Sequence, residues 1–129
     1  LSSGQSEGSI IVIIATDAPL DGRQLTRLAK RAALGLARTG STARHGSGDF
    51  MLAFSTANTI PHYPKEPTFQ QLHLADTHLN PLITATVEAT EEAILNALTM
   101  ATTMVGRDSH RIEAISLAKL RAILDRHAK

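Results

Sequence analysis

The sequence predicts an α/β fold from two apolar strand segments and the amphipathic helix between them. Residues 10–15 form a continuous and mostly β-branched run, which is typical of a central strand covered on both faces. Residues 50–55 have the composition of a second strand. Between them lies a helical stripe of apolar residues: Leu25, Leu28, Ala29, Ala32, Ala33 and Leu36. The order strand, helix, strand indicates a sheet packed against helices.

The chain between these elements is expected to be irregular. Gly40 should end the first helix, because glycine is common just after a helix, and a loop of small residues then runs to Gly48. Residues 57–79 contain several prolines, which disfavour regular structure, although a short strand is expected around residues 70–74.

Two further helices are expected in the second half of the chain. Asn80-Pro81 is a good helix start, and the apolar stripe that follows should end near Gly106. A last helix should begin at Ser116 and bury Leu117, Leu120, Ile123 and Leu124. Met100 and Met104 are expected in the core, and Asp108 and Ser109 are expected to cap or turn.

Length and composition limit the classes of function. The 129 residues are enough for one domain, and we find no internal repeat. A net charge of +1 and few aromatic residues argue against a nucleic-acid partner. The longest apolar run is too short to cross a bilayer, so we expect no membrane partner, and the compartment, cytoplasmic or periplasmic, stays open. A sheet of so few strands leaves unpaired edges, which indicates a missing partner segment.

The dipeptide Gly8-Ser9, directly before the first strand, is the first candidate for chemistry. A serine freed there by backbone cleavage would carry its own base, because its new α-amine has an unperturbed pKa of about 8. Gly-Ser before a strand is also a common turn, so the dipeptide alone leaves both interpretations open. Residues 1–8 are small and mostly polar, typical of a linker or of a segment awaiting cleavage.

A second candidate group, Gly46-Ser47-Gly48-Asp49, lies just before the second strand. Ser47 could hydrogen-bond a nucleophile or its amine, and Asp49 could keep that amine charged or oriented. A solvated turn capped by Asp49 is the structural alternative. A phosphate-binding loop fits less well, because the spacing matches no nucleotide-binding motif and no suitable lysine follows.

The histidines give only weak support for a metal site. His73 and His78 do not share a face on either a helix or a strand, so we expect both at the surface. His45 lies in the glycine-rich loop and is also expected to be solvated. Thr16 and Asp17 end the first strand, where active-site groups often gather, but capping the following turn is their expected role. We predict no metal and no cofactor.

Several segments together form a specific combination: Gly8–Leu20 (GSIIVIIATDAPL), the cationic helix with Leu25, Leu28 and Ala29, Ser47–Asn58 (SGDFMLAFSTAN), Glu91–Ala97 (EEAILNA) and Met104–Asp108 (MVGRD). They resemble the C-terminal part of the family of L-aminopeptidase/D-Ala-esterase/amidases and β-aminopeptidases. These are self-cleaving hydrolases with an N-terminal serine or threonine nucleophile. The resemblance covers nearly the whole chain after residue 8.

This resemblance implies a precursor that is cut between Gly8 and Ser9 into a larger α chain and a smaller β chain. The β chain would be residues 9–129, a single α/β domain. Ser9 would be the nucleophile and, through its amine, the base, while Ser47 and Asp49 match the positions that support it. Some relatives have glutamate at the acidic position, so the shorter Asp49 has less reach. The implied fold is a four-layer αββα sandwich, completed by an upstream α chain, in tetramers or octamers of αβ units.

Two functions are therefore expected. The first is an N-terminal-serine aminopeptidase, amidase or esterase that acts on short peptides, amides or esters through an acyl-enzyme. The family's α chain, which supplies an oxyanion-stabilising asparagine, a tyrosine and much of the substrate pocket, is absent from this sequence. While residues 1–8 stay attached, the nitrogen of Ser9 lies in a peptide bond and is not basic. The alternative is an inactive assembly or binding module of the same fold.

Overall fold

The structure is a computed structural model that describes residues 8–127. Apart from Gly8, the linker expected at residues 1–8 lies outside this range. By their internal contacts the residues form two compact units, 1–91 and 92–129, which are described separately.

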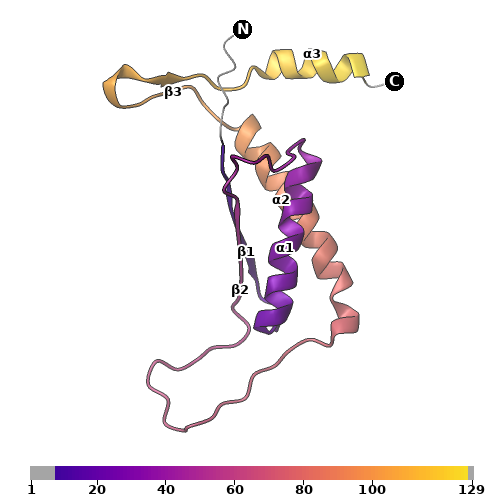
Figure 1. Cartoon of the computed structure of the whole chain (residues 1–129), viewed down its shortest axis with the longest axis vertical. Helices are drawn as coiled ribbons and strands as arrows, with labels where there is room; N and C mark the ends of the chain where they lie inside the picture. The colour runs from indigo at the N-terminus through magenta and orange to yellow at the C-terminus, as the bar shows by residue number, and fades with distance from the viewer. Residues whose placement is uncertain (1–7, 128–129) are drawn as a thin grey trace. The chain divides into compact units, whose positions relative to one another are not determined.

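The first unit is built on two parallel strands joined by a helix (Figure 1). Strand β1 (Ile11–Thr16) pairs with β2 (Phe50–Ser55) in a register that sets Ile11 opposite Phe50. Helix α1 (Gly22–Arg38) connects them, because parallel neighbours need a crossover rather than a tight turn. The predicted strand, helix, strand order is confirmed.

Helix α1 has the ends that its sequence favours. Asp21 caps the N-terminus: its carboxylate accepts the Gln24 backbone N–H (2.7 Å), and the Gln24 side chain accepts the Asp21 backbone N–H (3.1 Å). This reciprocal pair is a capping box, which satisfies two amides at the start of the helix. The C-terminus ends at Thr39, and Gly40 follows with a positive φ of 97°, as predicted for a glycine that stops a helix.

Helix α2 (Asn80–Thr99) begins at the predicted Asn80-Pro81 and ends before the predicted Gly106. Its buried residues are Thr86, Val87 and Thr90, and Gly35 of α1 lies directly against Val87 and Thr90. A side chain at Gly35 would meet the Val87 carbonyl oxygen, so glycine is required for this helix contact.

The core of the first unit lies around Leu20, Leu28 and Leu79. Partly buried residues pack against it: Ala18, Leu25, Leu74, Leu82 and Ile83. These residues bring the start of α1, the end of the 57–79 segment and the start of α2 together.

The strand expected around residues 70–74 does not form. The Asn58 side chain takes the place of a strand partner: its amide donates to the Leu72 carbonyl (2.8 Å), and its oxygen accepts the Leu72 N–H (2.9 Å). The Leu74 N–H donates to the Pro19 carbonyl (2.7 Å). With its backbone groups used in this way, the segment stays irregular up to a short 3-10 turn, η1 (Asp76–His78).

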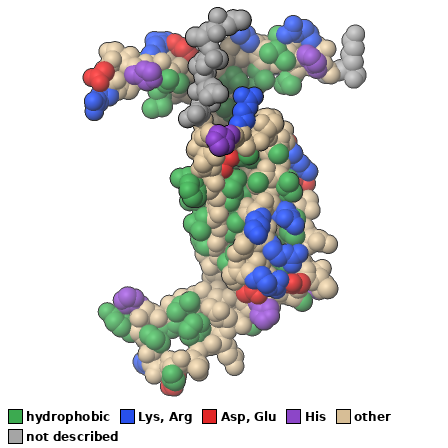
Figure 2. Space-filling model, viewed as in Figure 1, with side chains coloured by type: hydrophobic (Ala, Val, Ile, Leu, Met, Phe, Trp, Pro, Cys, Tyr) green, Lys and Arg blue, Asp and Glu red, His purple; other side chains and the backbone are tan. Residues whose placement is uncertain are grey.

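Only one face of the two-stranded sheet is covered by described residues of this chain. Exposure alternates along both strands, and the outward residues Ile11 (71% exposed), Ile13 (59%), Phe50 (69%) and Leu52 (57%) are apolar. Figure 2 shows apolar side chains along the strands and cations over α1. The prediction that residues 10–15 are covered on both faces is therefore wrong within this chain, because α1 packs on one side only.

The second unit holds a short hairpin and a helix. Strands β3 (Met104–Val105) and β4 (Arg111–Ile112) pair antiparallel, and helix α3 spans Leu117–His127. Between the strands, a 3-10 turn, η2 (Arg107–Ser109), places Asp108 and Ser109 at positive φ, so their predicted turn role is confirmed.

The core positions predicted for this unit are wrong. Met100 (79% exposed) and Met104 (68%) face solvent, and α3 buries none of the four residues expected to pack, Leu117, Leu120, Ile123 and Leu124. None of residues 92–127 is buried, because a unit this small cannot enclose a core of its own. Among the described residues, no helix combines the length and apolar character needed to cross a membrane.

Candidate active site

The candidate site forms where the two parallel strands begin. Ser9 lies just before β1, and Ser47 to Asp49 lie just before β2. Parallel strands place their N-terminal ends at the same edge of a sheet, so these segments meet. The Phe50 N–H donates to the Ile10 carbonyl (2.9 Å), which extends the strand pairing to the edge of the site.

Ser9 is exposed, and its hydroxyl is held by the backbone of the neighbouring loop. The Gly48 N–H donates to Ser9 Oγ at 2.9 Å. This contact fixes the position of the oxygen and favours negative charge on it, because an N–H group stabilises an oxyanion. The sequence predicts the Ser47 side chain as the hydrogen-bond partner of Ser9. In the uncut chain the backbone N–H of Gly48 makes this hydrogen bond instead.

Ser47 and Asp49 hold the backbone on both sides of Ser9. Ser47 Oγ lies 3.1 Å from the Gly8 carbonyl oxygen and 2.7 Å from Asp49 Oδ1. The same Asp49 oxygen accepts the Ile10 N–H at 3.1 Å. Asp49 therefore contacts the amide that follows Ser9 rather than the Ser9 nitrogen. All three predicted site residues converge, but the two supporting side chains contact each other and main-chain groups rather than the Ser9 side chain.

This arrangement suits acyl transfer at a serine. It offers an exposed hydroxyl, an N–H donor on that hydroxyl and a carboxylate that orients the chain around it. It offers no histidine base: His45 is exposed, as expected for a loop histidine. A base must therefore come from elsewhere, and the α-amine that cleavage before Ser9 would release is the nearest candidate.

The remaining candidates lie away from this site. Thr16 Oγ1 accepts the Ala18 N–H (3.1 Å), which confirms its predicted role in the turn after β1, and Asp17 beside it is exposed. Both residues are at the opposite end of β1 from Ser9. His73 and His78 are exposed, as predicted. Among the described residues, no group of three or more His, Cys, Asp or Glu side chains could hold a metal ion.

Two parts of the site were missed by reasoning from the sequence. They are the Gly48 N–H, which holds the Ser9 hydroxyl, and the contact of Ser47 with the carbonyl of Gly8, a residue predicted only as one side of the bond to be cut. Both are backbone groups, so no residue type signals them. The only hint is that Gly48 stands between the two predicted polar residues, Ser47 and Asp49.

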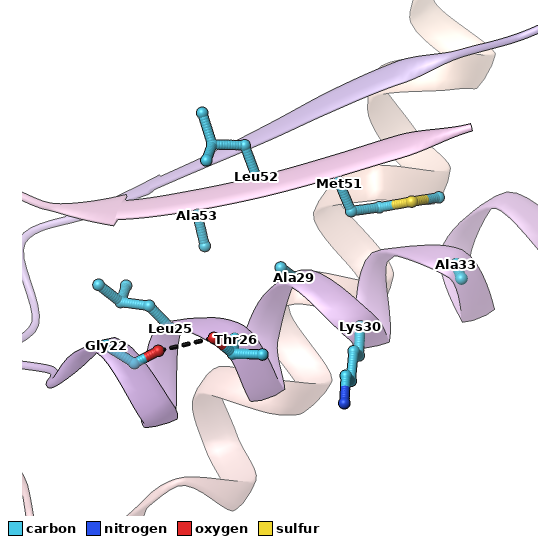
Figure 3. A pocket seen from close by; sticks show the side chains of 9 residues that line it. All are labelled: Gly22, Leu25, Thr26, Ala29, Lys30, Ala33, Met51, Leu52 and Ala53. Carbon is cyan, nitrogen blue, oxygen red and sulfur yellow. Dashed lines mark hydrogen bonds between the residues drawn. The ribbon is translucent and has the colours of Figure 1, made fainter. Parts of the chain in front are cut away.

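A separate groove of about 510 Å³ runs between α1 and β2. Figure 3 shows Ala53 pointing from β2 toward α1 and Leu52 pointing away from it, while Lys30 extends from α1 away from the strands. The other lining residues are Gly22, Leu25, Thr26, Ala29, Ala33 and Met51. The groove contains none of the three site residues, and apart from Lys30 and Thr26 it offers no side-chain polar group for chemistry.

Comparison with known proteins gives consistent matches. The chain is 42% identical over 123 residues to the β-peptidyl aminopeptidase BapA of Sphingosinicella microcystinivorans, covering 95% of this chain and 31% of that protein. Among solved structures, it matches the PH0078 protein of Pyrococcus horikoshii at 54% identity and a TM-score of 0.84, covering 98% of this chain and 36% of the other.

A further solved structure is the L-aminopeptidase D-Ala-esterase/amidase of Ochrobactrum anthropi, described as a new variant of the Ntn hydrolase fold. The identity is 40% and the TM-score 0.84, over 97% of this chain and 35% of the other. The chain thus spans about a third of the length of these relatives. The sequence description of peptidase family S58 matches residues 2–112. Because the family description matches most of its length and two of these relatives are named as aminopeptidases, this chain belongs to peptidase family S58.

Proposed function

We propose that this chain carries the nucleophile of an N-terminal-serine aminopeptidase with amidase and esterase activity. Cleavage of the backbone between Gly8 and Ser9 would make Ser9 the first residue of a β chain spanning residues 9–129. The observation that carries the proposal is the position of Ser9: exposed, at the start of β1, with its hydroxyl held by the Gly48 N–H at 2.9 Å. The relatives named as aminopeptidases support it.

The chemistry follows from joining a hydroxyl and an amine in one residue. The freed α-amine, with an ordinary pKa of about 8, takes the hydroxyl proton as Ser9 Oγ attacks the carbonyl carbon of a peptide, amide or ester. The amine or alcohol leaves, and an acyl-enzyme remains on Ser9. Water then releases the acid. Asp49 accepts the Ile10 N–H, so it fixes the backbone just after Ser9 and thereby limits where the new amine can lie.

The uncovered side of the sheet supports an upstream α chain as partner. Each strand has one edge without a partner among the described residues, and the outward face carries large apolar side chains. Apolar area of this kind is normally buried, and open strand edges are normally paired. A second sheet packed there would complete a four-layer αββα sandwich, and such αβ units would then assemble into tetramers or octamers.

The test uses the precursor produced with its complete upstream segment. Intact-mass analysis should find a break between Gly8 and Ser9, and an amino-acid p-nitroanilide should be hydrolysed. Ser9→Ala should abolish both, because one oxygen serves both reactions. The matched control is Ser55→Ala, which removes a hydroxyl from the other strand of the same sheet, bonded to the Ala18 carbonyl, and should leave the break and the hydrolysis in place.

Two results would contradict the proposal. One is a precursor that hydrolyses the substrate while residues 1–8 remain joined to Ser9. The other is equal hydrolysis by the wild type and Ser9→Ala, which would instead support the inactive assembly or binding module.

A further inference from the structure

Arg44 is the one lysine or arginine in residues 39–49, the loop that leads from α1 to the site. It opens a tight turn in which the Ser47 N–H donates to the Arg44 carbonyl oxygen at 2.8 Å. The first and last Cα atoms of such a turn lie within about 7 Å of each other. The next residue, Gly48, holds the Ser9 hydroxyl at 2.9 Å through its N–H. The base of the Arg44 side chain therefore lies close to the nucleophile.

The backbone just before this turn has an uncommon conformation. Ala43 has a φ of 45°, in the left-handed region that residues with a Cβ atom seldom adopt. Its N–H donates to Ser41 Oγ at 3.3 Å. Strained backbone of this kind persists only where the surrounding structure holds it, and it is common at ligand-binding sites. Here it sets the direction in which the chain enters the turn at Arg44.

The Arg44 side chain is exposed and forms no ion pair with a carboxylate among residues 8–127. The arginines that do form ion pairs in this part of the chain are Arg23, Arg27, Arg38, Arg107 and Arg111. Asp49, the carboxylate of the same loop, instead accepts the Ser47 hydroxyl and the Ile10 N–H. A guanidinium beside a nucleophile is thus left to bind a carboxylate of a ligand, through two parallel N–H donors.

We propose that Arg44 binds the C-terminal carboxylate of short peptide substrates, and that the enzyme therefore prefers them to amides and esters that lack this charge. This assignment rests on the proposed function, in which Ser9 attacks the first peptide bond of the substrate. In a dipeptide the free carboxylate lies one residue beyond that bond, a span of about 3.5 Å. A side chain as long as that of arginine, attached to the adjoining turn, covers such a distance.

The charge of Arg44 also favours one direction of the bound substrate. A short peptide carries an ammonium group at its N-terminus and a carboxylate at its C-terminus. Arg44 repels the first and attracts the second, so the leaving residue points toward the turn and the N-terminal residue points away from it. Because the turn is exposed, added salt should reduce the preference for a substrate with a free carboxylate.

The experiment compares three substrates of the matured enzyme, produced with its upstream segment. They are a dipeptide with a free carboxylate, the C-terminal amide of the same dipeptide, and the p-nitroanilide of its N-terminal residue. Arg44→Ala should lower kcat/KM for the free dipeptide by about 10- to 100-fold, as expected for a lost charge-assisted hydrogen bond, and leave the other two within about twofold. Arg44→Lys keeps the charge but not the two parallel donors, so it should recover part of the loss.

The matched control is Lys65→Ala, which removes an exposed cation from the 57–79 segment, beyond the other end of β2, and should leave the preference unchanged. If Arg44→Ala keeps the wild-type ratio of kcat/KM between the free dipeptide and its amide, the inference is overturned and the proposed function stands. An equal fall for all three substrates would also overturn it, because Arg44 would then support the loop rather than bind the carboxylate. A wild type that hydrolyses none of the three would reject the proposed function, and this inference with it.

Discussion

Arg23 and Asp76, 53 positions apart in the sequence, form a two-point ion pair. Arg23 Nη1 donates to Asp76 Oδ2 and Arg23 Nη2 donates to Asp76 Oδ1, both at 2.8 Å. The buried Gln24 side chain adds a third bond to Asp76 Oδ1 (2.8 Å) and also donates to the Leu74 carbonyl (2.6 Å). The pair thus fastens the end of the 57–79 segment to the first turn of α1.

We expect this contact to make stability depend on pH in the acid range. The hydrogen bonds from Arg23, then from Gln24, hold the pKa of Asp76 well below its ordinary value. A carboxyl whose folded pKa is lowered stabilises the fold above its unfolded pKa of about 3.9, and this contribution is lost as the pH falls below that value. Asp76→Asn should therefore flatten the fall in the urea midpoint between about pH 4 and pH 2.

The control for this prediction is Asp125→Asn, which removes the same charge from an exposed position on α3. The urea midpoint of Asp125→Asn should fall with decreasing pH as steeply as that of the wild type. If Asp76→Asn gives the same slope as the wild type, the ion pair is not coupled to folding.

Gly35 should be intolerant of any side chain. A Cβ atom there would lie 2.5 Å from the Val87 carbonyl oxygen and 2.7 Å from Thr90 Cβ, both on α2. The neighbours are backbone and a short branched side chain, so the helices would have to move apart. Gly35→Ala should lower the free energy of unfolding by about 1–3 kcal/mol, measured by urea denaturation.

The matched control is Gly22→Ala, in the same helix, where a Cβ would meet nothing within 4 Å. This change should be neutral or stabilise by up to about 1 kcal/mol, because alanine restricts the unfolded chain. Equal effects of the two substitutions would show that Gly35 is not a close contact in solution.

The elements predicted correctly are those whose signal is local. Strand β2 was predicted with the bounds that the structure gives, and α1 was predicted from its apolar period and from Gly40. The hairpin of β3 and β4 could not be predicted, because strands of two residues are too short to show an alternation of apolar and polar residues.

The errors come from partners that are distant in the sequence or lie outside it. Around residues 70–74 the composition suits a strand, but the Asn58 side chain satisfies the Leu72 backbone instead. Met104 is apolar and was expected in a core, yet none of the described residues of its unit is buried. At the site, Ser9, Ser47 and Asp49 were predicted to converge, and they do. Apart from the bond between Ser47 and Asp49, their contacts are with backbone groups, which residue types do not reveal.

Leu52 offers a test of what covers the open face of the sheet. Its side chain is 57% exposed and points away from α1 (Figure 3). If a second sheet from the upstream chain packs there, Leu52 is a core residue of the assembled enzyme. Leu52→Ala in the complete precursor should then cost about 2–5 kcal/mol, as at other buried leucines. If the side chain stays in solvent, the substitution should change the free energy of unfolding by less than about 0.5 kcal/mol.

The comparison is with Lys30→Ala, on the side of α1 that points away from the strands, which should stay within about 0.5 kcal/mol of the wild type. Urea denaturation followed by circular dichroism measures both variants, and size-exclusion chromatography reports whether assembly is kept. Because an exposed leucine on a free sheet face makes few contacts to lose, a large cost at Leu52 with none at Lys30 requires a packed partner. Equal small effects at both positions would instead mean that the face stays open to water, and the four-layer arrangement would have to be abandoned.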